Sequence, residues 1–217
     1  MPVRVGLKHI EIWNDTLEDT ILEYEAEPII KDQIVFYGPS HYTRWSTKWE
    51  HRPLREDLVG RSGTPCCINR GFGSSCPEHQ LYYYSRVIRP LAPRVLVYSS
   101  YGNSSAFGYS NEEAFELAQR VIMYALTDFP DIRVYTSGVN VSRKMIEEER
   151  GKEHEYNDMM REFAQNTPRC TFFNPLEYEP LWNTELFVKD GVHFNQDGYN
   201  VFADFYRIVL KDELAQY

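Results

Sequence analysis

The run Ile34-Val35-Phe36-Tyr37-Gly38-Pro39-Ser40 places a serine just beyond a short, continuously apolar segment. Apolar runs of this length, ended by glycine or proline, are typical of strands buried on both faces of a parallel sheet. Ligands of open parallel α/β sheets bind at the carboxyl ends of the strands. Ser40 is therefore expected at the edge of the sheet where a site would form, although a lone serine there is more often only a helix cap.

The rest of the chain alternates between similar short apolar runs and longer segments with helical periodicity. This alternation predicts βαβ units and an α/β fold whose parallel sheet is covered by helices on both faces. The predicted strands are residues 34–37, 66–69, 95–99, 133–136 and 171–174, and the predicted helices are residues 16–27, 111–128, 142–165 and 196–214. Ser110 and Glu113 form a capping box that predicts the start of the helix at 111.

The composition is that of a globular chain, with 217 residues, 42% apolar residues and 25% charged residues. We see no repeat or linker, so we expect a single domain over residues 1–217. The net charge of −9 argues against nucleic acid as the main partner, because phosphate binding requires clustered Lys and Arg. The four cysteines lack zinc-site spacing and are expected to be core residues of a reducing compartment: Cys66, Cys67, Cys76 and Cys170.

No apolar run approaches the eighteen residues of a membrane span, and no signal peptide is recognisable. We therefore expect a cytoplasmic location, with an export signal missing from the given sequence left open. The Lys-Asp-Glu-Leu run at residues 211–214 is followed by three further residues and so does not form a terminal retention signal.

A second polar constellation lies near the C-terminus, in Asp190-Gly191-Val192-His193. An aspartate three residues before a histidine can fold back to one ring nitrogen and leave the other as a general base for a serine. Taken alone, the pair is more often a capped turn or a surface histidine. A metal site formed with Asp197 is a weaker alternative, because no further ligand clusters with these residues.

Two further loops contain groups that could donate hydrogen bonds to an oxyanion. Asn69-Arg70-Gly71-Phe72-Gly73-Ser74-Ser75 follows the second predicted strand, and Tyr101-Gly102-Asn103-Ser104 follows the third. Each loop alone is more typical of a turn. Ser40 and these two loops follow the first three predicted strands, and Asp190 with His193 precedes the last predicted helix, so we expect all four segments to converge on one edge of the sheet.

In this order and placement, the chain resembles the SGNH hydrolases, also called the GDSL esterase and lipase family, over nearly its whole length. The run 34–40, followed by Thr43-Arg44-Trp45, is similar to the lysophospholipase L1-like branch. The resemblance implies a flavodoxin-like three-layer α/β/α sandwich with a central parallel sheet of about five strands. It also implies a Ser-His-Asp triad in which Ser40 is the nucleophile and His193, held by Asp190, is the general base and acid.

The resemblance further implies an oxyanion hole formed by the backbone amides of Ser40 and Ser74 and the side chain of Asn103. The implied activity is hydrolysis of carboxylic esters through an acyl-enzyme. The substrate would be a small-molecule ester with short acyl or acetyl groups, on carbohydrate or lysophospholipid-like molecules. No metal or organic cofactor is implied, and the oligomeric state is not indicated. Four residues near these motifs are expected to bind substrate, with core packing as the alternative: His41, Trp45, Tyr101 and Phe194.

Three positions depart from the family pattern. Pro39 and Ser104 stand where the family usually has aspartate, and Ser74 stands where it usually has its oxyanion glycine. These departures keep open a catalytically impaired binding or interaction protein with the SGNH fold, and the sequence does not separate a hydrolase from an acyltransferase. An ordinary α/β-hydrolase fits less well, because Tyr42 occupies the second glycine position of the nucleophile motif.

Overall fold

The computed structural model describes residues 10–148 and 154–217. Five parallel strands form one sheet in the order β2-β1-β3-β4-β5. The strands are β1 (Ile34–Gly38), β2 (Cys67–Gly71), β3 (Val95–Tyr98), β4 (Arg133–Ser137) and β5 (Cys170–Phe173). Since the chain moves outward from β1 first to β2 and then to β3, the strand order reverses beside β1, and such a switch point is where ligands of this architecture bind.

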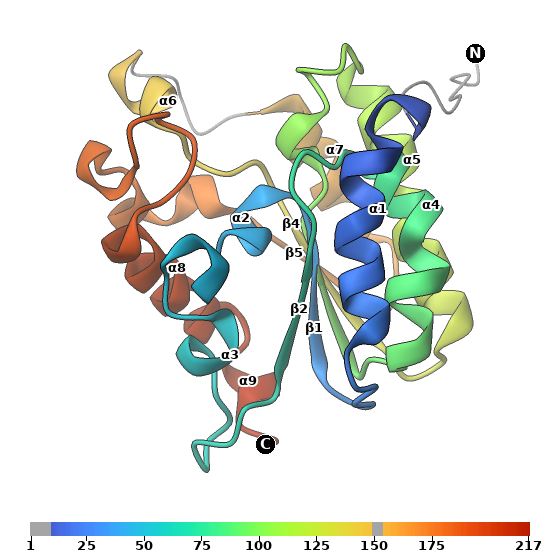
Figure 1. Ribbon diagram of the computed structural model, residues 1–217. Coiled ribbons are helices and arrows are strands. Elements are labelled where there is room, and N and C mark those ends of the chain that lie inside the picture. Colours follow the sequence, from blue (N-terminus) through green and yellow to red (C-terminus); the bar gives the residue numbers. More distant parts are fainter. Residues whose placement is uncertain (1–9, 149–153) are drawn as a thin grey trace.

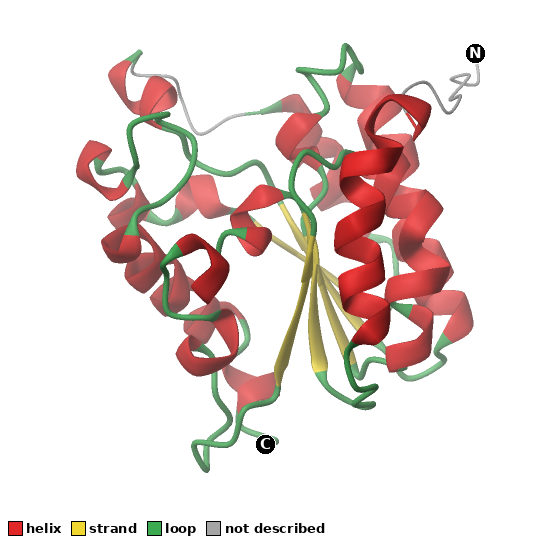
Figure 2. Ribbon diagram, viewed as in Figure 1, coloured by secondary structure: helices red, strands yellow, loops and turns green. Residues whose placement is uncertain are grey.

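The helices lie on the two faces of the sheet (Figures 1 and 2). They are α1 (Ile10–Ala26), α2 (Ser40–Thr43), α3 (Leu54–Asp57), α4 (Pro77–Val87), α5 (Asn111–Asp128), α6 (Arg143–Glu147), α7 (Glu155–Gln165), α8 (Gln196–Val209) and α9 (Lys211–Leu214). Short 3-10 turns occur at Thr47–Trp49, Arg89–Leu91, Tyr101–Asn103, Pro175–Glu177, Glu179–Leu181 and Thr184–Leu186. None of the described helices has both the length and the hydrophobicity needed to cross a lipid bilayer.

Alternate residues of each central strand enter different cores, as the two-residue period of a strand requires. Val35 and Tyr37 of β1 pack in the core beneath α1, α4, α5 and α7. Ile34 and Phe36 of the same strand pack in the core beneath α2, α3 and α8. Every residue of β1 is buried, which explains why the run reads as continuously apolar.

The predicted fold class is confirmed, and each predicted strand lies within one or two residues of the observed one. Helix α5 begins after its capping box, in which Ser110 accepts the Glu113 amide and the Glu113 carboxylate accepts the Ser110 amide. The cysteines are free, with three buried and Cys170 half-buried.

The prediction of one helix over residues 142–165 is wrong, and residues 149–153 of that range lie outside the described residues. Helix α6 ends at Glu147, and α7 starts afresh at Glu155. The backbone of His154 is extended, and its ring accepts the amide hydrogen of Tyr156, so His154 acts as the N-cap of a new helix. The final helix is likewise divided at Leu210 into α8 and α9.

Candidate active site

The carboxyl ends of β1 and β2 hold helix α2 in a narrow space. A side chain at Gly71 would place its Cβ 2.5 Å from the Thr43 nitrogen, and one at Gly38 would place it 2.7 Å from the Ser99 carbonyl oxygen. Both contacts are closer than real Cβ atoms tolerate, so glycine is required at Gly71, where β2 meets α2, and at Gly38, where β1 meets the residue after β3. Ser40 is the first residue of this helix, immediately beyond the end of β1.

Side chains from other elements fix α2 from below. The Asn69 amide donates to the Tyr42 carbonyl at 2.6 Å, and the Tyr199 hydroxyl of α8 donates to the His41 carbonyl at 3.0 Å. Tyr42 and Tyr206 share a hydrogen bond of 2.6 Å between their hydroxyls. The Tyr42 carbonyl also accepts the Trp45 amide at 3.0 Å, so Asn69 adds a second donor to it and ties α2 to β2.

The loop before α8 presents the histidine. Val188 donates its amide to the His193 carbonyl at 2.8 Å, and Phe187 forms an isolated antiparallel bridge with Phe194. Within the turn, Asp190 Oδ1 accepts the backbone amides of Val192 and His193 at 2.9 Å each. These bonds fold residues 188–194 into a tight hairpin with the His193 ring on it.

The structure brings Ser40, His193 and Asp190 together in a continuous hydrogen-bonded chain. His193 Nε2 lies 2.7 Å from Ser40 Oγ, and His193 Nδ1 lies 2.8 Å from Asp190 Oδ2. A carboxylate can only accept, so the ring carries its proton on Nδ1, and Nε2 accepts the Ser40 hydroxyl proton. Both ring nitrogens are thereby engaged, which leaves neither for a metal ion.

Electrostatics keep this pair in the protonation states that base catalysis requires. Burial lowers the pKa of His193 below 6.5, and the Asp190 carboxylate opposes this shift. Although burial alone would raise the pKa of Asp190, the backbone amides of His193 and Val192 and the His193 ring hold it well below its usual range. At neutral pH the ring is therefore neutral and the carboxylate ionised.

The two loops predicted to donate to an oxyanion converge on the same edge. A Cβ at Gly73 would lie 3.9 Å from the Ser40 Cβ, and one at Gly102 would lie 2.8 Å from Pro39 Cγ. The Asn103 amide donates to the Ser75 carbonyl at 2.7 Å and so joins one loop to the other. Ser74 is exposed, and its φ of 63° is in the left-handed region. That conformation explains why glycine is the usual residue at this position in the family that the sequence resembles.

Two of the four residues predicted to bind substrate have no exposed surface. Trp45 and Phe194 are fully buried in the core beneath α8, where the Trp45 indole donates to Asp57 at 2.7 Å. We therefore do not retain these two as substrate-binding residues, because neither exposes any surface. Tyr101 is half-buried, packs against Tyr156 with its ring tilted, and donates its hydroxyl to the Asn111 side-chain oxygen.

His41 is also buried, and its role is structural. Its Nε2 donates to the Val192 carbonyl at 3.1 Å, and its ring lies 5.7 Å from that of His193. Burial, with a smaller contribution from nearby His193, lowers the pKa of His41 to about 3. This histidine therefore supports the turn from below as a neutral donor. The only feature of the sequence that pointed to His41 was its position next to Ser40, and that position did not predict this supporting role.

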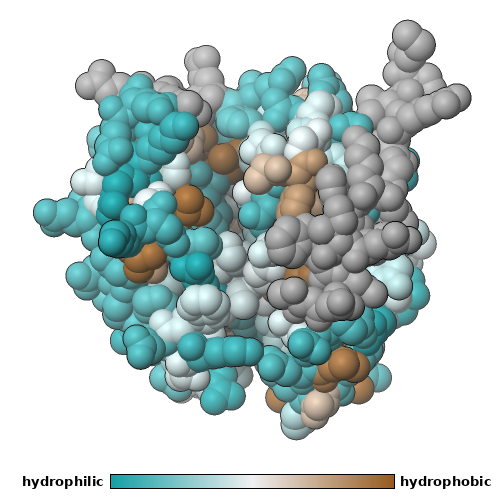
Figure 3. All heavy atoms as spheres, turned by 45° about the horizontal axis from the view of Figure 1, so that its top comes forward, coloured by the Kyte–Doolittle hydropathy of each residue, from teal (hydrophilic) through white to brown (hydrophobic). Residues whose placement is uncertain are grey.

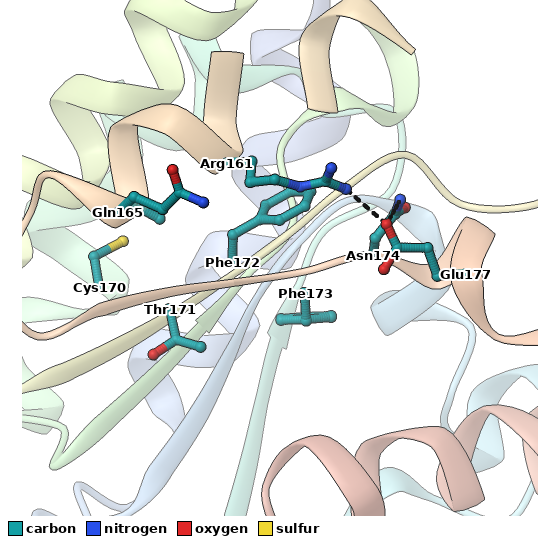
Figure 4. A pocket seen from close by; sticks show the side chains of 9 residues that line it. Arg161, Gln165, Cys170, Thr171, Phe172, Phe173, Asn174 and Glu177 are labelled. Carbon is teal, nitrogen blue, oxygen red and sulfur yellow. Dashed lines mark hydrogen bonds and ion pairs between the residues drawn. The ribbon is translucent and has the colours of Figure 1, made fainter. Parts of the chain in front are cut away.

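A separate groove on the surface contains none of the triad residues. A groove of about 360 Å³ runs along β5 and α7, where Arg161 lies over Phe172 and pairs with Glu177 (Figure 4). None of its lining residues belongs to the Ser40 site. Over residues 10–148 and 154–217, no three His, Cys, Asp or Glu side chains are grouped so that they could hold a metal ion.

Solved structures share this fold over most of the chain. A GDSL-like lipase from Bacteroides thetaiotaomicron aligns with a TM-score of 0.67 and 16% identity, over 91% of this chain and 98% of the lipase. A family 3 carbohydrate esterase from Clostridium thermocellum aligns with a TM-score of 0.60 and 15% identity, over 85% of this chain and 97% of the esterase. A lipase/acylhydrolase from Enterococcus faecalis aligns with a TM-score of 0.62 and 17% identity, over 84% of this chain and 96% of that protein.

No protein-family model and no curated protein matches the sequence. At 15–17% identity, the likeness to these three structures concerns the fold. The fold places the carboxyl ends of β1, β2 and β3 side by side, and the chemistry of this chain has to be argued from its own residues.

Proposed function

We propose that this chain is a serine hydrolase of the SGNH type, which cleaves carboxylic esters through a Ser40–His193–Asp190 triad and an acyl-enzyme. The observation that carries the proposal is the unbroken chain of hydrogen bonds from Ser40 Oγ through both ring nitrogens of His193 to Asp190. A serine is activated as a nucleophile when a neutral imidazole accepts its proton and a carboxylate orients that imidazole.

In the first half of the reaction, Ser40 Oγ attacks the ester carbonyl carbon while His193 Nε2 takes the hydroxyl proton. The tetrahedral intermediate collapses when the carbon–oxygen bond to the alcohol breaks, and the imidazolium returns the proton to the departing alcohol. In the second half, water attacks the acyl-enzyme with the same ring as base, which releases the acid and restores Ser40. Asp190 stays ionised and stabilises the imidazolium in both halves.

The negative charge that develops on the carbonyl oxygen requires donors already in place. We assign the backbone amides of Ser40 and Ser74 and the side chain of Asn103 to this oxyanion hole. Ser40 begins helix α2, so its amide has no partner within the helix. The close approach of Gly73 to Ser40 and the hydrogen bond from Asn103 to Ser75 support the assignment, because they bring both loops to the nucleophile.

The proposed substrates are small-molecule esters with acetyl or other short acyl groups, on carbohydrate or lysophospholipid-like molecules. Solved structures of the same fold include an acetyl xylan esterase and a GDSL-like lipase, which supports testing both classes. Hydrolysis of acetylated sugars should be compared with that of esters of graded chain length. The ratio of kcat/KM values between the two sets identifies the preferred acyl group.

The triad is tested with a fluorophosphonate probe and a short-chain nitrophenyl ester. We expect the protein to be labelled at Ser40 and to hydrolyse the ester, and Ser40→Ala to lose both. Ser46→Ala is the matched control, since this nearby hydroxyl only donates to the Thr43 carbonyl, and it should retain both. Folded protein that is neither labelled nor active would instead favour a binding protein built on the hydrolase scaffold.

A further inference from the structure

Arg44 lies beside the triad and is held on two sides. One guanidinium nitrogen, Nη1, donates to Asp190 Oδ2 at 3.3 Å. The guanidinium carbon also lies 4.4 Å from the centre of the Trp49 ring, which places the cation over the aromatic face. The Arg44 side chain is only 24% exposed. A planar cation stacked on one face and paired along one edge has little freedom to turn toward another partner.

The oxygen that Arg44 contacts is the one that also serves His193. Asp190 Oδ1 accepts the amides of Val192 and His193, whereas Asp190 Oδ2 accepts both the His193 ring and the Arg44 guanidinium. The carboxylate is thus bonded on both oxygens. Two positively polarised groups compete for Oδ2, so the guanidinium reduces the negative charge that the imidazole experiences.

The charged and titratable groups around the His193 ring come from three parts of the chain. Asp190 lies on the same turn and favours the imidazolium, whereas Arg44, just after α2, disfavours it. His41, on α2 beneath the ring, stays neutral because burial lowers its pKa to about 3. Tyr199 of α8 lies near both Arg44 and Asp190, and burial raises its pKa, so it is neutral as well. Arg44 is therefore the cation that offsets Asp190.

We propose that Arg44 is a positioning residue of this hydrolase: bonded to Asp190 Oδ2 and stacked on Trp49, it fixes the carboxylate and limits how strongly that carboxylate favours a protonated His193. The catalytic effect of Arg44 rests on the proposed function. Because Arg44 opposes protonation of the ring, His193 remains neutral and the enzyme active under mildly acidic conditions, where the histidine of an uncompensated Asp–His pair would be protonated.

The sequence alone did not assign this role, because no motif pairs Arg44 with Asp190, which lies 146 residues away. A substrate-binding role for the guanidinium is less well supported. Its exposed surface is small, and both its face and one of its edges already have partners in the protein.

The test is a titration of the His193 ring by NMR on protein labelled at the histidine ring carbons, with the resonance assigned by its loss in His193→Asn. In Arg44→Met we expect the His193 titration midpoint to rise by about 0.5 to 1 pH unit, because the opposing positive charge is gone. Arg44→Lys keeps the charge and should stay within about 0.3 pH units of the wild type. Arg161→Met is the matched control, since this arginine is also stacked and ion-paired but lines the separate groove at β5.

The acid limb of kcat/KM should move upward in parallel in Arg44→Met, with KM for an uncharged ester within about threefold of the wild type. An unchanged midpoint in a folded Arg44→Met protein would overturn the proposal, as would a KM increase without any change of midpoint. The ring titration needs no turnover and can be repeated in Ser40→Ala. If Ser40→Ala stayed active, the proposed function would fail, and the titration would still show whether Arg44 acts on the ring.

Discussion

The hydroxyl of Ser40 and the ring of His193 are 153 residues apart in the chain and 2.7 Å apart in space. His193 is placed by the turn that Asp190 closes, whereas α2, which begins at Ser40, is fixed by Asn69 and Tyr199 from other elements. The sequence predicted their meeting from the order and placement of the motifs and from the family resemblance that these carry. The groups that adjust their electrostatics, Arg44 and His41, belong to no such motif and were not predicted in these roles.

The lowered pKa of His193 predicts the pH dependence of the reaction. The ring must be neutral to accept the Ser40 proton, so kcat/KM should be full above pH 6.5 and fall as the pH drops through a midpoint below 6.5. The measurement is a kcat/KM profile with an ester that does not titrate, read at the isosbestic wavelength of the product. A midpoint well above pH 7 would contradict the environment described for the ring.

Asn103 is the side-chain donor of the proposed oxyanion hole, and its removal is expected to slow the reaction. Asn103→Ala should lower kcat by about 10² to 10³ with little change in KM, because a donor that acts on the developing oxyanion contributes mainly in the transition state. The measurement is steady-state hydrolysis of a short-chain ester. Asn166→Ala is the control, since that exposed amide only donates to the Glu162 carbonyl at the end of α7. Full activity in Asn103→Ala would remove Asn103 from the oxyanion hole.

Among the elements, β1 and β3 were predicted within one residue because every residue of these two strands is buried and their runs are apolar. Strands β2, β4 and β5 contain polar or partly exposed residues, and they were predicted within two residues from short apolar runs that alternate with helices. Helix α5 was predicted at its observed bounds because its cap is local in sequence. The break between α6 and α7 was missed, since it depends on the extended backbone of His154, and a histidine N-cap is a weak sequence signal. Burial of Trp45 and Phe194 also depends on the packing of α8, which no local pattern reveals.

The loop after β2 holds a conformation that its residue does not favour. Ser74 adopts a φ of 63°, which costs an L-residue about 1 kcal/mol relative to glycine. Ser74→Gly should therefore raise the free energy of unfolding by about 0.5 kcal/mol, after the greater backbone freedom of glycine in the unfolded chain is counted. Activity should be kept, because the proposed oxyanion donor at this position is the backbone amide.

Urea denaturation measures this change. Ser105→Gly is the control, since Ser105 is exposed in the neighbouring loop without a positive φ, and it should not gain stability. Destabilisation by Ser74→Gly comparable to that of the control would show that the left-handed backbone imposes no cost at position 74.

At the scale of the whole molecule, the surface seen at the carboxyl edge of the sheet is mostly hydrophilic, with separate hydrophobic spots (Figure 3). Trp49 and Val192 are among the exposed large hydrophobic residues and flank the triad through their contacts with Arg44 and His41. Below this edge, the core beneath α8 reaches the site directly, since the His41 ring packs against Phe194 and Phe202 of that core. Stability and catalysis are therefore coupled through α2.

This coupling predicts a loss of stability in acid that originates at His41. Its pKa is about 3 in the folded protein and about 6.5 when exposed, so the unfolded chain binds an extra proton between these values. The contribution of the neutral His41 ring to the free energy of unfolding is complete above pH 6.5 and is lost as the pH falls toward 3. The loss is on the order of 2 kcal/mol by pH 4.5. His41→Gln keeps a donor for the Val192 carbonyl but does not titrate. It should be less stable than the wild type at pH 7.5 and lose less stability on acidification.

The measurement is urea denaturation of both proteins at pH 7.5 and 4.5. His51→Gln is the control, because its ring is only half-buried and its pKa is lowered less by burial, so its removal should leave most of the acid dependence in place. His193, whose pKa is lowered by burial, also titrates in this interval, but it is present in both proteins, and the Asp190 carboxylate stays ionised in the folded protein at both pH values. The difference between the two proteins therefore reports on position 41. If His41→Gln and the wild type lost equal stability on acidification, the titrating group would lie elsewhere in the molecule. The proposed coupling between the core beneath α8 and the active site would then be wrong.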